Sequence, residues 1–209
     1  MKINKAKNII FDLGGVIINL NQDLTYKAFH NIFPLAFDEI LEQLETTNWL
    51  ERYEVGEFNS NEFLNWFKQF DSKVTDIQLI NAWNSMLLDI PKVRLDLIVH
   101  LSKSHNVYLL SNTNQIHYQF IEDYVKANFE GLDFNSLFKK VYLSHEIKLR
   151  KPNKGIFEFV LNDNNLTASD TVFIDDSAEH VESAKQLGID THHLNLKENQ
   201  TLTQLFNEH

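Results

Sequence analysis

Residues 8–15 of the chain, Asn8-Ile9-Ile10-Phe11-Asp12-Leu13-Gly14-Gly15, join an apolar run to an aspartate and a pair of glycines. The run Asn8–Leu13 is short and rich in β-branched and aromatic side chains, which predicts a strand buried on both faces. The glycines that follow favour a tight turn. Ligands of open parallel sheets bind just beyond the carboxyl ends of the strands. Asp12 is therefore a candidate functional residue.

Similar apolar runs recur later in the chain and alternate with helical patterns. The further predicted strands are Asn106–Ser111, Lys140–Ser144, Thr171–Asp175 and, more weakly, Thr191–Leu196. The predicted helices between them are Asn114–Asn128, Asn153–Leu161 and Ala178–Leu187. Alternation of this kind is typical of βαβ units. We predict an α/β fold, a Rossmann-like, doubly wound parallel sheet.

The stretch between the first and second strands differs, because it contains long amphipathic patterns and no convincing strand. These patterns predict helices over Leu24–Leu44, Asn61–Phe70 and Asp76–Leu87. Gly56 suits a helix stop, and Asn59-Ser60-Asn61-Glu62 suits a turn and a new N-cap, which predicts a helical hairpin. We expect a core domain over residues 1–19 and 91–209, with an all-helical domain inserted at residues 20–90.

Composition excludes several classes of protein. The 209 residues include 43% hydrophobic side chains, enough for a sizeable core. Nineteen Lys and Arg against 29 Asp and Glu give a formal charge of −10, which disfavours nucleic acid as a partner. The absence of cysteine excludes disulfides and thiolate metal sites. The apolar stretch Asn8–Leu20 is too short to span a bilayer. We expect a cytoplasmic monomer or homodimer without membrane contact.

The residues that follow the predicted strands form a chemically coherent set. A carboxylate such as Asp12 can attack phosphorus and form a labile acyl phosphate. Ser111 can donate to a phosphoryl oxygen, as can backbone N–H groups in the turn that begins at Asn112. Lys151 can compensate the negative charge that accumulates in phosphoryl transfer.

The acidic pair Asp175-Asp176 would lie at the same sheet edge as Asp12. Three carboxylates in one place repel one another unless one is protonated or a cation joins them. An all-oxygen site beside a phosphate favours Mg²⁺. The sequence thus predicts a magnesium site formed by these aspartates.

These motifs, in this order, resemble those of the haloacid dehalogenase-like hydrolases. The matching stretches are Phe-Asp-Leu-Gly-Gly-Val at 11–16, Leu-Leu-Ser-Asn-Thr-Asn at 109–114, Arg-Lys-Pro at 150–152 and Phe-Ile-Asp-Asp-Ser at 173–177. The chain looks most similar to bacterial sugar-phosphate phosphatases of the glucose-1-phosphatase type. The resemblance implies a Mg²⁺-dependent phosphatase of small phosphorylated metabolites, such as a hexose 1-phosphate, with residues 20–90 as a cap.

The resemblance also implies a role for each matching residue. Asp12 would be the nucleophile that is transiently phosphorylated, and Ser111 and Lys151 would act on the phosphoryl group. The implied phosphate-binding residues are Leu13, Gly14, Ser111, Asn112 and Lys151. The implied metal ligands are Asp12, the carbonyl oxygen of Gly14, Asp175 and Asp176.

One position departs from the pattern of most phosphatases in this superfamily. They carry a second aspartate, which protonates the leaving group, two residues after the nucleophile, where this chain has Gly14. The glucose-1-phosphatase-like branch is similar in having glycine there. Losing a general acid typically costs roughly 10²–10⁴-fold in rate. Tyr53, Glu57, His30 or a water molecule are candidate replacements.

Other interpretations stay open at this point. Asp176 or Ser177 can merely cap the following helix, and Ser111 can form a local turn with Thr113. The nine histidines lack metal-ligand spacing and are expected to be structural. A haloacid dehalogenase also uses an aspartate nucleophile but needs no metal, so Asp175-Asp176 argues against it. A catalytically silent binding or regulatory protein is the other alternative, and Gly14 is the feature that favours it.

Overall fold

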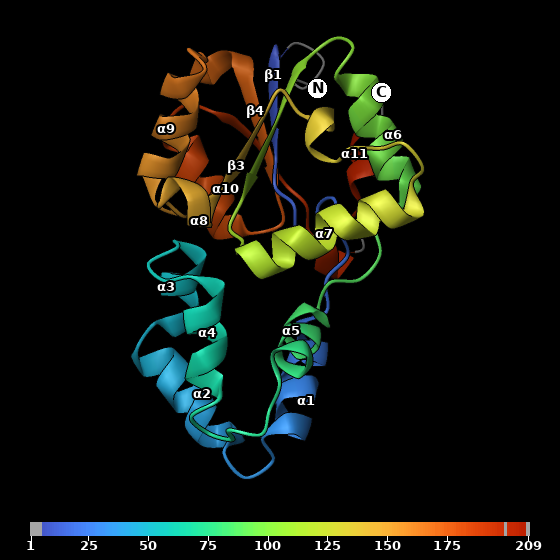
Figure 1. Cartoon of the computed structure of the whole chain (residues 1–209). Coiled ribbons are helices and arrows are strands. Elements are labelled where there is room, and N and C mark those ends of the chain that lie inside the picture. The colour runs from blue at the N-terminus through green and yellow to red at the C-terminus, as the bar shows by residue number, and fades with distance from the viewer. Residues whose placement is uncertain (1–5, 199, 208–209) are drawn as a thin grey trace.

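The computed structural model describes residues 6–198 and 200–207. Within these residues, parallel strands form a five-stranded sheet in the order β3-β2-β1-β4-β5 (Figure 1). The strands are β1 (Asn8–Phe11), β2 (Asn106–Ser111), β3 (Lys140–Leu143), β4 (Thr171–Asp175) and β5 (Asp190–His193). Strand order reverses between β1 and β4, so their carboxyl ends form a topological switch point. The predicted doubly wound α/β fold is confirmed.

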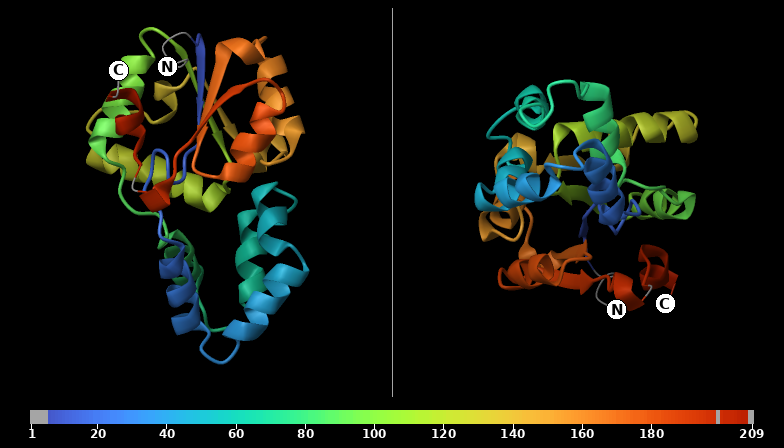
Figure 2. Two further views of the ribbon diagram at one scale, coloured as in Figure 1. Left: turned by 180° about the vertical axis from the view of Figure 1, so that it is seen from behind. Right: turned by 90° about the horizontal axis from the view of Figure 1, so that it is seen from below.

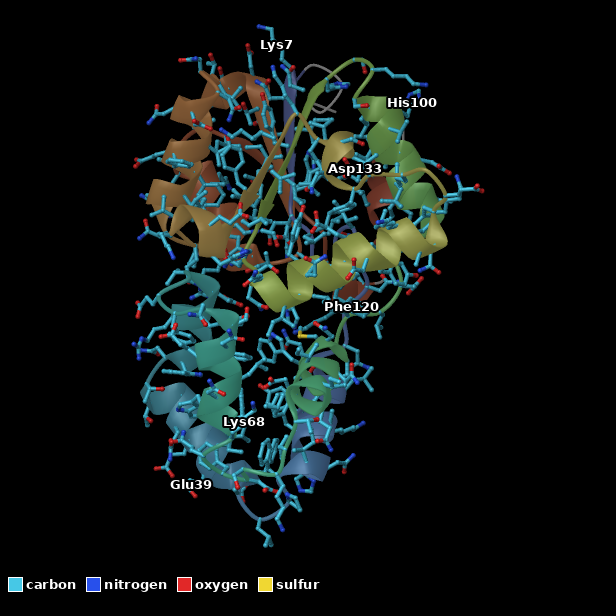
Figure 3. The ribbon with its side chains drawn as sticks, viewed as in Figure 1. Lys7, Glu39, Lys68, His100, Phe120 and Asp133 are labelled. Atoms are coloured by element: carbon cyan, nitrogen blue, oxygen red, sulfur yellow. The ribbon has the colours of Figure 1, made fainter. Side chains whose placement is uncertain are left out.

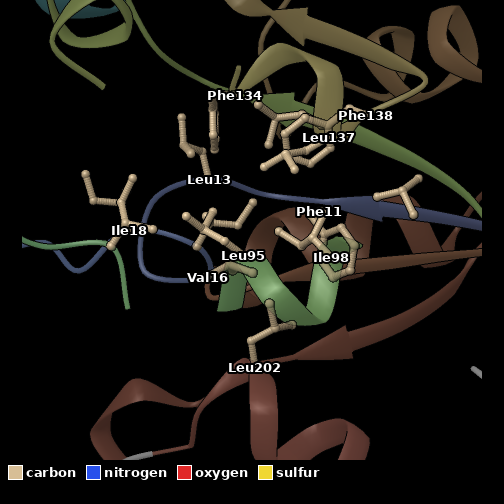
Figure 4. Close-up of a cluster of buried hydrophobic side chains, with 14 of the residues drawn as sticks. Phe11, Leu13, Val16, Ile18, Leu95, Ile98, Phe134, Leu137, Phe138 and Leu202 are labelled. Carbon is tan, nitrogen blue, oxygen red and sulfur yellow. The ribbon is translucent and has the colours of Figure 1, made fainter. Parts of the chain in front are cut away.

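Helices cover both faces of this sheet, and β1 shows why. Ile9 and Phe11 pack into the cluster on one face, whereas Ile10 packs into the cluster on the other, because side chains alternate along a strand. The helices on the first face are α6 (Lys92–Leu101), α7 (Gln115–Asn128) and α11 (Leu202–Asn207), and part of their contact with β1 is drawn in Figure 4. The helices on the second face are α9 (Lys154–Asp163) and α10 (Ala178–Lys185).

A separate helical unit, defined here as residues 22–84, lies beyond one end of the sheet (Figures 1 and 2). Its helices are α1 (Gln22–Ile32), α2 (Phe37–Thr46), α3 (Trp49–Glu54), α4 (Ser60–Phe67) and α5 (Asp76–Asn84). Its interior is rich in aromatic rings: Phe63 stacks on Tyr53 at a centroid distance of 4.1 Å and meets Phe67 edge-on at 5.2 Å. Such packing supplies a hydrophobic core distinct from those of the sheet.

The helical unit lies at the carboxyl ends of the strands. Lys7, just before β1, is at the opposite end of the molecule (Figure 3), where it pairs with Asp170 at 2.6 Å. The chain enters and leaves the unit side by side, since Leu20 forms an antiparallel bridge with Leu87. Ile116, at the start of α7, packs into the aromatic core of the unit. The sheet edge that carries the candidate site therefore faces these helices.

Some predicted element boundaries are wrong. The expected helix Leu24–Leu44 is interrupted between α1 and α2, where Pro34 disfavours helical geometry in the residue before it and has no N–H to donate. The strand expected over Lys140–Ser144 ends at Leu143, because Ser144 begins the short helix α8 (Ser144–Ile147). The fifth strand, Asp190–His193, begins one residue before the predicted range Thr191–Leu196 and ends three residues before that range does.

The remaining expectations have different outcomes. The predicted N-cap near residue 59 is confirmed, because Asn59 and Glu62 form a reciprocal capping box at the start of α4. The helices α3 and α6 were not predicted individually. The domain boundaries at 19/20 and 90/91 stay predictions, and residues 1–5, 199 and 208–209 of the predicted core lie outside the described residues. Every described helix falls short of the length and apolar character needed to cross a bilayer.

Candidate active site

The centre of the site is an ammonium group held between two aspartates. Asp12 follows β1 and donates its N–H to Ile174 O at 2.9 Å, which extends the pairing with β4 and brings Asp12 level with Asp175. Lys151 Nζ lies 2.5 Å from Asp12 Oδ1 and 2.7 Å from Asp175 Oδ2. The lysine side chain is fully buried, with 0% of its surface exposed. A buried ammonium of this kind requires partners, and here it has them.

Lys151 reaches this position through hydrogen bonds rather than through a strand. The side chain of Asn112 clamps its backbone: Nδ2 donates to Lys151 O at 2.8 Å, and Oδ1 accepts from Lys151 N at 2.9 Å. Nζ also donates to Leu110 O at 2.9 Å, so all three ammonium protons have acceptors. The Asn112 side chain thus positions Lys151, so any phosphate contact predicted for Asn112 would have to come from its backbone.

Asp175 is held on its other side by the start of α10. Its Oδ1 accepts from Ser177 N at 2.7 Å and contacts His180 Nδ1 at 3.0 Å. Burial alone would raise the pKa of Asp175, but Lys151 and His180 outweigh it and lower the pKa to about 2. Ser177 occupies the N-cap position of α10, as one interpretation allowed, but its side chain makes no capping hydrogen bond.

The two other aspartates differ from Asp175 in their ionisation. Burial raises the pKa of Asp12 to about 7, and the nearby carboxylates Asp175 and Asp176 add to this while Lys151 opposes it. Burial and the proximity of Asp175 also raise the pKa of Asp176. The group is therefore short of positive charge, because one ammonium faces three carboxylates.

This shortage suits a divalent cation. Ligand atoms from Asp12, Asp175 and Asp176 all lie within 4.8 Å of one another. Gly15 makes the approach of Asp176 possible: its φ is +70°, and a Cβ there would lie 2.5 Å from Asp176 Oδ2. Hard oxygen donors in this arrangement fit Mg²⁺.

The other predicted phosphate-binding residues lie at the same sheet edge. Ser111 ends β2 with 2% of its surface exposed, and its hydroxyl makes one long hydrogen bond, 3.4 Å to Asn112 O. The side chain of Leu13 packs into the hydrophobic core (Figure 4), so its backbone is the part available to a ligand. Gly14 is close-packed, since a Cβ there would lie 2.7 Å from Leu20.

A cavity of about 900 Å³ lies between this sheet edge and the helical unit. Its core side includes Asp12, Ser111 and Asp176, and apolar side chains form much of the wall that the helical unit provides. The apolar wall residues of the unit are Phe29, Phe37, Ile40, Leu41, Leu44, Leu50, Phe67 and Trp83. This volume is ample for a small metabolite.

Among the described residues, the three side chains considered as replacements for the acid missing at Gly14 do not line this cavity. Tyr53 is buried among aromatic rings and hydrogen-bonded to Ser60. Glu57 pairs with Arg52 at 2.7 Å, and His30 lies beside Phe37 on a separate surface. These three candidates are therefore not supported.

Sequence reasoning missed four polar or charged residues of the cavity wall. His180 was missed because it lies within α10, five residues after Asp175, rather than at the end of a strand. Arg150 bridges from the core to the helical unit, with Nη1 2.7 Å from Glu51 Oε1 and Nη2 3.2 Å from Glu54 Oε2. The ion pairs of Arg150 with Glu51 and Glu54 could not be predicted from the sequence, because the helix that carries both glutamates, α3, was not predicted individually.

The fold and the site together define a class of hydrolase, and comparison with known proteins identifies it. The sequence profile described as haloacid dehalogenase-like hydrolase matches residues 9–193. The chain belongs to this family, as its motifs indicated.

Three relatives illustrate the relationship. The D-ribitol-5-phosphate phosphatase of Bacteroides thetaiotaomicron is 31% identical over 189 residues, which cover 88% of this chain and 90% of the relative. A HAD family enzyme from the same species, solved in complex with magnesium and inorganic phosphate, has a TM-score of 0.81 and 37% identity, covering 90% of this chain and 93% of its own. A predicted HAD-like family hydrolase from Porphyromonas gingivalis has a TM-score of 0.80 and 29% identity, covering 98% of this chain and all of its own, 100%.

Proposed function

We propose that the protein is a Mg²⁺-dependent phosphatase of small phosphorylated polyols or sugars that works through a phosphorylated Asp12. The observation that carries the proposal is the fully buried Lys151, held between Asp12 and Asp175 at 2.5 and 2.7 Å. A solvated surface lysine needs no such partners, whereas a site for a phosphoryl group needs a fixed positive charge. The names of the relatives support the same reaction class.

Asp12 is the attacking group in this proposal. Lys151 holds its Oδ1, which leaves Oδ2 without a hydrogen-bond donor among the described residues. Oδ2 attacks phosphorus, the bond to the leaving oxygen breaks, and an aspartyl phosphate forms. Water then hydrolyses the aspartyl phosphate and releases inorganic phosphate. Lys151 compensates negative charge on the phosphoryl oxygens throughout both steps.

The remaining residues bind and orient the phosphoryl group. The Ser111 hydroxyl, whose present hydrogen bond is long, donates to one phosphoryl oxygen. Backbone N–H groups of Leu13, Gly14 and Asn112 add further donors at the same edge. Because Asn112 fixes the Lys151 backbone with two hydrogen bonds, these donors and the ammonium keep a constant spacing.

The residues that would hold Mg²⁺ are Asp12, Asp175, Asp176 and the carbonyl oxygen of Gly14. When bound, the ion would neutralise the carboxylates and polarise the phosphoryl oxygens. Its support here is the cluster of carboxylate oxygens within 4.8 Å, together with the approach of Asp176 to Gly15.

The helical unit acts as a cap in this proposal and supplies the contacts that select the substrate. Support comes from the cavity, whose walls it shares with the sheet edge. The substrate is a small phosphorylated metabolite, with D-ribitol 5-phosphate and hexose 1-phosphates as the compounds to test first. We further propose that the enzyme works in the cytoplasm as a monomer or a homodimer.

The test measures phosphate release from a panel of sugar and polyol phosphates, with Mg²⁺ or with EDTA, for the wild type and Asp12→Asn. The matched control is Asp96→Asn, which changes an exposed aspartate of α6 that pairs with Lys92. We expect metal-dependent release that is lost in Asp12→Asn and kept in the control. Release that survives Asp12→Asn rules out this mechanism.

A second candidate function, a silent binding module, is favoured by Gly14, because the family resemblance implies an acid at this position in most phosphatases of the superfamily. Retained binding of phosphate without turnover of any compound in the panel supports that alternative.

A further inference from the structure

The structure offers a carboxyl group in place of the acid that Gly14 lacks. Glu54 is the last residue of α3 and lines the same cavity as Asp12, Ser111 and Asp176. It comes from the helical unit, so it approaches the site from the side opposite to the sheet edge. A leaving group that departs from the phosphoryl group toward the cavity would pass this wall.

Glu54 is tied to the phosphoryl site through Arg150. Arg150 Nη2 lies 3.2 Å from Glu54 Oε2, and Arg150 is the residue immediately before Lys151, whose backbone Asn112 clamps. The position of Glu54 is therefore coupled to that of the lysine. Its other oxygen, Oε1, has no hydrogen bond or ion pair among the described residues, so it is available to a ligand.

The surroundings of Glu54 favour its protonated form. Burial raises the pKa of Glu54, and Glu51 adds to this, while Arg150 and His180 oppose it without reversing it. From the side of α8, Lys148 donates to Gly56 O instead of to Glu54. Glu54 thus holds a proton more readily than an ordinary glutamate does.

Other carboxyl groups of the cavity wall do not share this environment. Glu45 and Glu51 also line the cavity but are exposed, whereas Glu54 is half-buried. Glu51 pairs with the same guanidinium at 2.7 Å, so the two glutamates share Arg150.

Resting on the proposed phosphatase function, we propose that Glu54 is the general acid that protonates the leaving oxygen of the substrate. As Asp12 Oδ2 forms its bond to phosphorus and the bond to the substrate oxygen breaks, the proton of Glu54 moves to that oxygen and an alcohol leaves. The Glu54 carboxylate that remains is stabilised by Arg150. In the second step it accepts a proton from the water that attacks phosphorus, which releases Asp12 and restores the acid.

The test compares Glu54→Gln with the wild type on two kinds of substrate. One is the alkyl phosphate that the wild type hydrolyses fastest, whose alkoxide needs a proton in order to leave. The other is p-nitrophenyl phosphate, whose nitrophenolate leaves without one. We expect Glu54→Gln to lower kcat/KM about 10²-fold or more for the alkyl phosphate and by less than about 3-fold for the nitrophenyl ester. We compare kcat/KM because it covers the steps up to release of the leaving group and excludes hydrolysis of the aspartyl phosphate, which both substrates share. Glu57→Gln is the control, since Glu57 is an exposed glutamate of the same helical unit that pairs with Arg52 and does not line the cavity. It should change both rates by less than about 3-fold.

The pH profile gives a second readout. A general acid must be protonated, so the wild-type kcat/KM for the alkyl phosphate should fall on the alkaline side, and Glu54→Gln should lack that limb. Glu54→Asp, which keeps an acid, should retain more alkyl phosphatase activity than Glu54→Gln.

The outcomes separate this inference from the proposed function. Equal losses of kcat/KM on both substrates in a Glu54→Gln protein that melts like the wild type assign Glu54 a structural role and overturn the inference alone. If Glu54→Gln is too unstable to assay, Glu54→Asp takes its place in the test. Its rates on the alkyl phosphate and on the nitrophenyl ester must then fall by different factors, and equal factors overturn the inference. No release from either substrate by the wild type overturns the proposed function and this inference together.

Discussion

The two sides of the cavity bury very different groups. At the sheet edge, Lys151 is fully enclosed, and its charge is met by Asp12, Asp175 and a carbonyl oxygen. In the helical unit, the enclosed groups are aromatic rings such as Tyr53 and Phe63, stacked at 4.1 Å. The sheet edge is held together by the ion pairs of Lys151, whereas the helical unit is held together by the packing of apolar side chains.

This difference determines how each side responds to substitution. Removing one member of a buried charge network leaves its partners unpaired, so the cost comes from the groups that remain. Removing part of a packed ring leaves a cavity, so the cost scales with the volume lost. The chemistry of the site therefore depends on the sheet edge, and the shape of the cavity depends on the helical unit.

Lys151→Met should have the largest effect, because it leaves Asp12 and Asp175 facing each other without a cation. We expect the free energy of unfolding to fall by about 3–5 kcal/mol and phosphate release to fall by about 10²–10³-fold or more. Chemical denaturation and a phosphatase assay measure these changes. The control is Lys154→Met, an exposed lysine at the start of α9. Equal stability of the two variants would mean that the buried ion pairs contribute nothing.

Phe63→Ala tests the other side of the comparison. Phe63 is fully buried and contacts Tyr53, Phe67 and Trp83. We expect a loss of about 3–5 kcal/mol in the free energy of unfolding, measured by urea denaturation. Phe159→Ala is the same substitution at an exposed position of α9 and should cost much less. Comparable losses would show that the helical unit does not rely on its aromatic core.

The sheet edge was the more predictable side, for a physical reason. Asp12, Ser111 and Asp175 each stand at or directly after the end of an apolar strand, and parallel strands bring their carboxyl ends together whatever the details of packing. Knowing the strands was enough to predict that these residues meet. The cluster of three aspartate oxygens agrees with that expectation.

The helical unit was less predictable, because its contacts depend on how helices pack rather than on where they end. The break at Pro34 was present in the sequence but was outweighed by the amphipathic pattern around it. The pairing of Arg150 with Glu54 joins residues far apart in the chain, and nothing in local periodicity indicates it. Lys151 is intermediate, since it follows no strand directly and reaches the site through Asn112.

His117 lies where the two sides meet, and it predicts a pH dependence of stability. It stacks on Trp83 at 4.7 Å, and its Nε2 contacts Trp83 O at 3.0 Å. Burial lowers the pKa of His117 from 6.5 to about 4. The unfolded chain therefore binds a proton that the folded protein excludes between these pH values. The free energy of unfolding therefore keeps its full value above pH 6.5. It falls by up to about 3 kcal/mol as the pH falls toward 4.

The measurement is the free energy of unfolding of the wild type and His117→Gln from pH 7 to pH 4. We expect the variant to be less stable than the wild type at pH 7. The difference between their free energies of unfolding should narrow as the pH falls, because the variant has no imidazole to protonate. His100→Gln changes an exposed histidine of α6 and should follow the wild type throughout (Figure 3). A gap that stays constant for His117→Gln would contradict the prediction.

Asn59→Ala should have the smallest effect, because it removes one cap while leaving the aromatic core in place. The Asn59 side chain accepts from Glu62 N at 3.0 Å, and Glu62 Oε2 accepts from Asn59 N at 2.8 Å. Alanine removes the first of these two hydrogen bonds and keeps the backbone N–H that donates to Glu62. The loss should cost about 1 kcal/mol in the free energy of unfolding, measured by urea denaturation. Asn61→Ala is the control, since Asn61 is exposed two residues later and caps nothing. If both variants lose the same free energy of unfolding, the start of α4 is fixed by the packing of Phe63 against its neighbours. The helical unit is then stabilised by the packing of its apolar side chains alone.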